Sequence, residues 1–305
     1  MSIPVVITTP ESVARPAARV SFWGIMRGEF LKIARLLWWM LGIMAIGFAV
    51  AFLLGASSQN DKAYLQQTPL HFLYSVAESN LVLIRILGGI FLLVLTSFVV
   101  GREYQYGTIR ILLARGAGRV QLLFAKLAVL ALIAASLLGV FILFEAALIC
   151  IQMLTLVGNL NAFSALTPAF WANMGIDLVT VVLSMGATIL LATAMNALGR
   201  SFTFGLSASL TWFPIDNMGI VVMNALGRLT GSDFWSNVTA YMLGPLLNRL
   251  PTMLLPAGVR FGFESFGTGP LVAVSGAHAL WVIGAYSLGF LLLALIPTWK
   301  RDVRE

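Results

Sequence analysis

The run from Leu36 to Leu54 constrains the fold more than any other feature, because its 19 residues contain no charge. A helix of about 20 apolar residues crosses a bilayer core of roughly 30 Å, and five further segments of the chain have a similar character. Only 10% of all residues are charged, whereas soluble domains contain about a quarter. We therefore expect an all-α integral membrane protein.

Six transmembrane helices are predicted within one transmembrane domain, residues 1–305. We place them at about 36–54, 81–100, 127–150, 178–198, 202–222 and 277–297. The third apolar run continues to Val157, so its helix is expected to tilt or to extend past the membrane. Residues 223–276 are predicted to form an extracytoplasmic loop. Three prolines interrupt its apolar stretch LGPLLNRLPTMLLPAG, which is expected to be re-entrant or to lie at the interface.

Basic residues determine the predicted orientation, since Lys and Arg are enriched on the cytoplasmic side of membrane proteins. Most of the 19 basic residues precede the first span, follow the sixth, or lie in the second-to-third and fourth-to-fifth connections. Both termini are therefore predicted to be cytoplasmic, in a multi-pass protein of the plasma (or bacterial inner) membrane. The net charge of +7 is explained in the same way, so we expect no nucleic-acid partner.

Residues 1–35 are predicted to be a cytoplasmic N-terminus that contains an amphipathic helix. Apolar residues recur every three or four positions on one helical face, namely Phe22, Met26, Phe30, Ile33 and Leu37. Glu29 falls near the edge of this stripe, which makes the pattern imperfect. We expect the helix to lie on the inner membrane surface, and the alternative is a cytoplasmic extension of the first span.

Motifs for catalysis are absent from the sequence. It has no G-x-x-x-x-G-K-[ST] phosphate loop, so this chain is not expected to hydrolyse nucleotide by itself. It has no H-E-x-x-H or G-x-S-x-G motif either, and its two histidines, His71 and His278, lie far apart. We therefore predict no catalytic residue, no metal site and no cofactor in this chain.

Residues 101–126, GREYQYGTIRILLARGAGRVQLLFAK, form a long polar connection between the second and third predicted spans. Connections between neighbouring helices usually have about 2–8 residues. Within the segment, Glu103, Gly107 and Thr108 resemble the E-x-x-x-G-T…LL…R…K signature of ABC-2-type permeases. In that family the signature also follows the second span and leads into the third.

The resemblance implies that the chain is the permease subunit of an ABC exporter. Such permeases act as dimers, with an identical or a sister permease, and are driven by a separate ATP-binding subunit that would hold ATP and magnesium. The resemblance also implies that residues 101–126 contain a coupling helix that contacts this subunit. The residues assigned to coupling are Arg102, Glu103, Gly107, Thr108, Arg110 and Arg115.

These residue types suit a docking segment. Gly107 permits a tight change of direction, and Thr108 can cap the helix that follows. The arginines could pair with acidic groups on a partner. The alternative is that the arginines only enforce topology and contact anionic lipid head groups, which leaves Glu103 and the Gly-Thr pair unexplained.

Charged residues inside the predicted spans suggest a second functional region. Arg85, Glu145 and Asp216 are all predicted to lie in the outer half of the membrane. We hypothesise that Arg85 pairs with Glu145 or Asp216 and holds an extracellular gate closed or locks the bundle. In the alternative, Glu145 lies in water at the interface and Arg85 extends to the same layer. Asp177 is predicted to be a helix N-cap.

The only indication of the substrate class is an apolar face of the first predicted span. Met40, Met44 and Phe48 line one face of the first span, which suits a hydrophobic or amphipathic substrate, although packing against helices or lipid is the more frequent explanation. Export by an ABC-type permease is the favoured function. The alternative is a non-transporting accessory or structural membrane subunit derived from such a permease. An ion-coupled transporter is disfavoured, because no carboxylate cluster occurs in mid-membrane.

Overall fold

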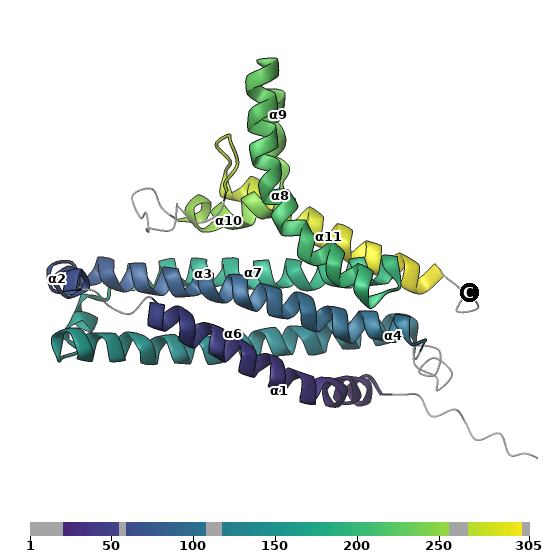
Figure 1. The fold of residues 1–305 in the computed structure, drawn as a ribbon, viewed down its shortest axis with the longest axis horizontal. Coiled ribbons are helices and arrows are strands. Elements are labelled where there is room, and N and C mark those ends of the chain that lie inside the picture. The colour runs from purple at the N-terminus through teal and green to yellow at the C-terminus, as the bar shows by residue number, and fades with distance from the viewer. Residues whose placement is uncertain (1–20, 55–58, 108–117, 256–267, 301–305) are drawn as a thin grey trace, which may run out of the picture.

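The structure, a computed structural model, describes residues 21–54, 59–107, 118–255 and 268–300 (Figure 1). The described residues form helices joined by short turns, with no strand among them. The long helices are α1 (Phe22–Leu54), α3 (Pro69–Thr96), α6 (Arg119–Val157), α7 (Pro168–Gly199), α8 (Phe202–Thr230) and α11 (Gly276–Lys300). Between them lie α2 (Gln59–Gln67), η1 (Ser97–Gly101), α4 (Arg102–Gln105) and η2 (Asn161–Ala165).

Among the described residues, five helices are long and apolar enough to cross a membrane, namely those that contain α1, α3, α6, α7 and α11. The prediction of an all-α membrane protein is therefore confirmed, whereas the count of six spans is not. Helix α8 is not among the five. Its sequence contains Pro214, Asp216 and Asn217 near its middle, and these lower its mean hydropathy.

The helices are longer than the predicted spans. Helix α6 has 39 residues, which correspond to about 58 Å at 1.5 Å per residue, so it extends past a bilayer core of roughly 30 Å, as expected for the third span. Helix α3 begins at Pro69 rather than near position 81. Its first turns bury Phe72 and Tyr74 in a cluster with α6 and α7, and these contacts stabilise helix outside the apolar run.

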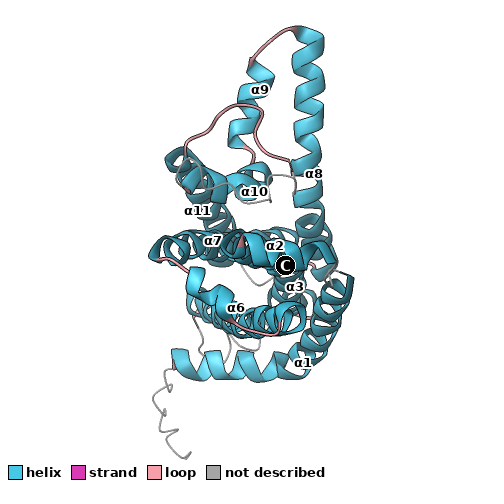
Figure 2. Ribbon diagram, turned by 90° about the vertical axis from the view of Figure 1, so that its left-hand side faces the viewer, coloured by secondary structure: helices cyan, strands magenta, loops and turns pink. Residues whose placement is uncertain are grey.

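Helix α1 combines the predicted amphipathic helix and the predicted first span in one uninterrupted helix. Figures 1 and 2 show that it bends, and its first turns run across the direction of its remaining length. Met26 and Ile33 of the apolar stripe are buried in a core that α3, α6 and α7 share. The predicted amphipathic segment thus forms the bent beginning of α1, continuous with the first span, and Met26 and Ile33 of its stripe face the bundle. Its position on the inner membrane surface stays a prediction.

The bundle has two ends, which we name the α4 end and the α2 end after the short helices located there (Figure 1). The first turns of α1, helix α4, the α7–α8 turn and the last turns of α11 all lie at the α4 end. The orientation predicted from basic residues requires these four regions to share one side. The α7–α8 turn contains Arg200 at φ 48° and Ser201, whose side chain caps α8 at Phe204 N.

Helix α7 is the centre of the bundle and packs against α3, α8 and α11. Its buried positions include many small residues, among them Ala187, Ala194 and Ala197. Small side chains allow neighbouring backbones to approach closely, as is usual between membrane helices. The α4 half of α7 therefore holds α3 and α8 at close range.

The predicted extracytoplasmic loop, residues 223–276, is largely helical where the structure describes it. Helix α8 continues to Thr230, and α9 (Phe234–Val238), η3 (Thr239–Tyr241) and α10 (Leu243–Leu254) follow. The second half of α8 leaves the bundle (Figures 1 and 2). Pro214 lies near the middle of α8 and removes one helical hydrogen bond, which explains a bend there.

Helix α10 is the proline-interrupted apolar stretch. Its 12 residues are too few to span a membrane, in agreement with the sequence-based expectation. Leu243, Leu246 and Leu250 are fully buried in a cluster with α7, α8 and α11. Protein rather than lipid covers this face of α10.

Candidate functional site

Four charged side chains meet at the α4 end and form what we call the charge cluster: Glu29 and Lys32 of α1, Glu103 of α4, and Lys126 of α6. Lys126 Nζ lies 2.5 Å from Glu29 Oε2 and 3.0 Å from Glu103 Oε2. Lys32 Nζ lies 2.6 Å from Glu29 Oε1 and 2.9 Å from Glu103 Oε1. Each ammonium group therefore bridges both carboxylates, and the cluster connects three helices.

The charges of the cluster balance, and most of them are shielded from solvent. The side chains of Glu29 and Lys126 are each 4% exposed, that of Glu103 is 11% exposed, and that of Lys32 is 47% exposed. Removing one partner from a buried ion pair costs about 3–5 kcal/mol, because the other charge stays uncompensated. The cluster therefore fixes α1, α4 and α6 relative to one another.

Local backbone structure places Glu103 in the cluster. It follows η1, a π-helical turn, and such turns occur frequently at functional sites. Lys126 Nζ also donates to the carbonyl oxygen of Val99 in this turn, at 3.1 Å. A Cβ atom on Gly101 would lie 2.8 Å from Phe202 Cα, so only glycine allows η1 to approach the start of α8 this closely.

A hydrogen bond from Asn196 further fixes this region. Its Nδ2 donates to Ser97 Oγ at 3.0 Å and to the carbonyl of Ala192 at 2.7 Å. On the other side of α4, the hydroxyl groups of Tyr104 and Thr298 of α11 lie 3.2 Å apart. Helix α4 is thus connected to the bundle on several sides.

The residues predicted for ATPase coupling are only partly covered by the structure. The Arg102 guanidinium lies over the rings of Phe98, at 5.3 Å, and Tyr106, at 5.6 Å. Gly107 has φ +66°, a left-handed conformation that glycine adopts without strain, and it turns the chain after α4. Thr108, Arg110 and Arg115 lie outside the described residues.

The site residues predicted from the sequence do not include Glu29, Lys32 or Lys126. The signal that could have found Glu29 was its position beside an apolar stripe, since a carboxylate there requires a buried partner. The partner, Lys126, lies 97 positions away in the sequence. No local pattern indicates such a contact.

A second polar region surrounds Arg85 of α3. Arg85 Nη1 donates to the carbonyl of Leu247 at 2.9 Å, and Nη2 donates to Asn248 Oδ1. Asn248 Nδ2 in turn donates to Asn217 Oδ1 at 2.7 Å and to the carbonyl of Thr268 at 3.2 Å. We call Arg85, Asn217, Asn248 and Thr268 the Arg85 network. It connects α10 to α3 and α8.

The predicted pairing of Arg85 with Glu145 or Asp216 is not found in the structure. Glu145 Oε1 accepts from Asn80 Nδ2 at 2.8 Å, and Asp216 Oδ2 accepts from the backbone N–H of Gly244 in the first turn of α10. That N–H has no partner within its helix, and a carboxylate is favoured there. No ion pair joins Arg85, Glu145 and Asp216, all three of which the structure describes. Helix α10 supplies the acceptors of Arg85 instead.

Asp177 is also placed differently from the prediction. Helix α7 begins at Pro168, and its N-cap is Thr167, whose Oγ1 accepts from Phe170 N at 3.3 Å. Asp177 therefore lies inside α7, and the predicted N-cap role is wrong. It is buried within the bundle.

The model of one protein family, described as "ABC-2 family transporter protein", matches residues 25–213. This match covers more than half of the chain. The chain belongs to the ABC-2 transporter family. All four residues of the charge cluster lie within the match, which ends one residue before Pro214 of α8. No curated protein matches this ABC-2 chain.

Membership of the family makes this ABC-2 protein a permease component of an ABC-type transporter. Permeases of this family generally work with an ATP-binding subunit. Within the described residues, no group of three His, Cys, Asp or Glu side chains could hold a metal ion.

Proposed function

We propose that this ABC-2 permease is the membrane subunit of an exporter, and that a separate ATP-binding subunit drives it by binding residues 101–126 in the cytoplasm. The observation that carries this proposal is the 3.0 Å ion pair between Glu103 and Lys126. These residues lie near the two ends of the segment. Their contact holds α4 and the beginning of α6 together, and this α4–α6 unit is what a bound partner would push.

Displacement of this unit would reach the spans through the contacts described above. Glu29 and Lys32 connect it to α1, and the Tyr104–Thr298 contact connects it to α11. Because these connections are short and mostly buried, they transmit movement with little loss. Closure of the ATP-binding subunits would thus tilt α1 and α11 and switch the pathway from inward-facing to outward-facing.

The remaining parts of the proposal concern membrane, assembly and substrate. The permease lies in the plasma or inner membrane with both termini in the cytoplasm, acts as a dimer, and exports a hydrophobic or amphipathic substrate. The Arg85 network serves as the outer lock in this scheme. Its hydrogen bonds hold α10 against α3 and α8, and an outward-facing state requires them to rearrange.

Co-purification tests the proposed function. The tagged full-length chain is isolated from its native membrane in mild detergent, and its partners are identified by mass spectrometry. The expected result is an ATP-binding chain in stoichiometric amount, whose ATPase activity is faster in the complex than alone. A stable complex without any nucleotide-binding chain would instead support the accessory, non-transporting role.

A further inference from the structure

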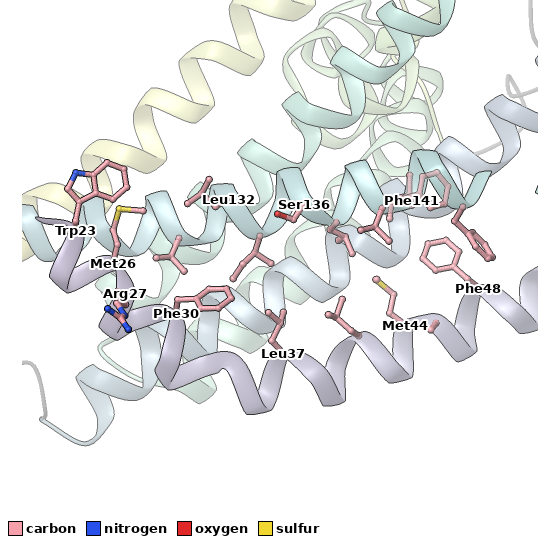
Figure 3. A pocket seen from close by; sticks show the side chains of 18 residues that line it. Trp23, Met26, Arg27, Phe30, Leu37, Met44, Phe48, Leu132, Ser136 and Phe141 are labelled. Carbon is pink, nitrogen blue, oxygen red and sulfur yellow. The ribbon is translucent and has the colours of Figure 1, made fainter. Parts of the chain in front are cut away.

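A cleft lies between α1 and α6 and is also lined by Ile84 of α3. Its lining includes none of the residues of the charge cluster or of the Arg85 network. Its volume is about 770 Å³, which is within the usual range of roughly 300–1,000 Å³ for ligand pockets. Figure 3 shows side chains of α1 and α6 that face one another across it. Met44 and Phe48, which the sequence placed on one face of the first span, both line the cleft.

The cleft is apolar along nearly its whole length. Apart from Arg27, Ser136 and the indole of Trp23, its lining side chains are hydrocarbon or thioether groups. The α6 lining extends from Val129 to Phe144, about 23 Å at 1.5 Å per residue. An acyl chain in one leaflet extends through half of the bilayer core, about 15 Å. The cleft is therefore long enough for such a chain.

Arg27 stands at the end of the cleft where α1 begins (Figure 3). Its guanidinium is exposed and makes no hydrogen bond or ion pair within the part of the chain that the structure describes. The nearby carboxylates, Glu29 and Glu103, are already paired with Lys32 and Lys126. Among the residues that the structure describes, Arg27 thus has no compensating carboxylate at the α4 end, where it lies beside the exposed Trp23. Tryptophan and arginine are typical of the membrane–water interface.

From this arrangement we infer that the cleft binds an anionic phospholipid of the leaflet at the α4 end. One acyl chain lies between α1 and α6, and the phosphate group pairs with Arg27. Arginine suits this role because its planar guanidinium donates two parallel hydrogen bonds to a phosphate. The lipid would cover the apolar surface that α1 leaves open beside α6. Binding of this lipid does not require the proposed ATP-binding partner.

Photocrosslinking tests this site on the full-length protein in phosphatidylcholine nanodiscs. Phosphatidylglycerol with a diazirine in one acyl chain is added at low mole fraction, and labelled peptides are identified by mass spectrometry. The matched probe is phosphatidylcholine with the same diazirine chain. The expected labels lie on the cleft face of α6, around Leu132, Ser136 and Val140. Phosphatidylglycerol should label this face roughly fivefold more than phosphatidylcholine, as expected for one basic residue at an anionic head group.

Variants distinguish a built site from general lipid contact. Arg27→Gln removes the phosphate partner and should abolish the preference for phosphatidylglycerol. Arg35→Gln makes the same change on the same helix, at an exposed position outside the cleft, and should leave the preference intact. Ala45→Trp fills the cleft from an exposed lining position and should reduce labelling by both probes.

Three outcomes would overturn the inference. The first is equal labelling of all lipid-facing helices, which is general lipid contact only. The second is a preference for phosphatidylglycerol that Arg27→Gln and Arg35→Gln reduce equally. The third is the absence of label from either lipid probe on the cleft face of α6, as expected if a second copy of the chain covers it.

Discussion

The charge cluster predicts a large difference between its two lysines. Lys126 Nζ lies within 3.1 Å of three oxygen atoms, those of Glu29, Glu103 and the Val99 carbonyl. Lys126→Met keeps a flexible, unbranched side chain but leaves two carboxylates to share Lys32. We expect this change to lower the free energy of unfolding by about 3–5 kcal/mol.

The matched control is Lys32→Met. The Lys32 side chain is 47% exposed, and an exposed ion pair contributes only about 0–1 kcal/mol. Both carboxylates still pair with the buried Lys126 in this variant, and water can reach the half-exposed position that Lys32 leaves. The double variant Glu29→Leu with Lys126→Met should recover most of the loss, because an apolar pair can replace a buried ion pair at little cost.

Unfolding of the purified chain in mixed micelles of increasing SDS content, followed by circular dichroism, measures all three variants. The order of stability should be wild type, Lys32→Met, the double variant, then Lys126→Met. If Lys126→Met and Lys32→Met shift the transition by the same small amount, the cluster does not act as a buried unit and the reasoning is refuted.

Two further predictions concern close contacts elsewhere in the bundle. Arg85→Met leaves the Leu247 carbonyl and Asn248 Oδ1 without their donor, which should lower the stability by about 1–3 kcal/mol for each acceptor. The charge exchange Arg85→Glu with Glu145→Arg should not restore the thermal stability measured in detergent. Restoration would instead support the ion pair predicted from the sequence. Gly101→Ala places a Cβ atom 2.8 Å from Phe202 Cα and should cost about 1–3 kcal/mol. The Cβ atom that Gly139→Ala adds inside α6 meets no other atom within 4 Å, so this variant should stabilise the protein by about 0.5–1 kcal/mol. Equal melting temperatures for the two glycine variants would contradict the close approach of η1 to α8.

Hydropathy predicted the helical membrane class because about 20 apolar residues in a row have few other stable environments. It could not predict where the helices end. The first turns of α3 contain Glu78, which is buried by packing inside the bundle rather than by lipid. In a hydropathy profile such a residue indicates the end of an apolar segment. In the structure the helix already begins at Pro69, nine residues before Glu78.

The polar contacts were predicted less well than the helices, because they depend on which helices become neighbours. The partner of Arg85 was sought among carboxylates, but α10 brings the Leu247 carbonyl and the Asn248 amide to it. The prolines around α10 predicted a segment that does not span the membrane. They did not predict which helices this segment packs against. The resemblance to the family signature identified Glu103 as a functional residue. Its contact with Lys32 of α1 could be found only from the structure.

Position-specific photocrosslinking at Tyr106 tests directly whether an ATP-binding subunit docks on residues 101–126. Tyr106 is 65% exposed and follows α4 at the base of residues 101–126. Tyr64 of α2 is 43% exposed at the opposite end of the bundle. Each tyrosine is replaced in turn by p-benzoylphenylalanine, and the native membranes are irradiated. We predict that an ATP-binding subunit crosslinks to position 106 and not to position 64. Crosslinks to that subunit at both positions in equal yield, or at neither, would contradict the proposed docking of the ATP-binding subunit on residues 101–126.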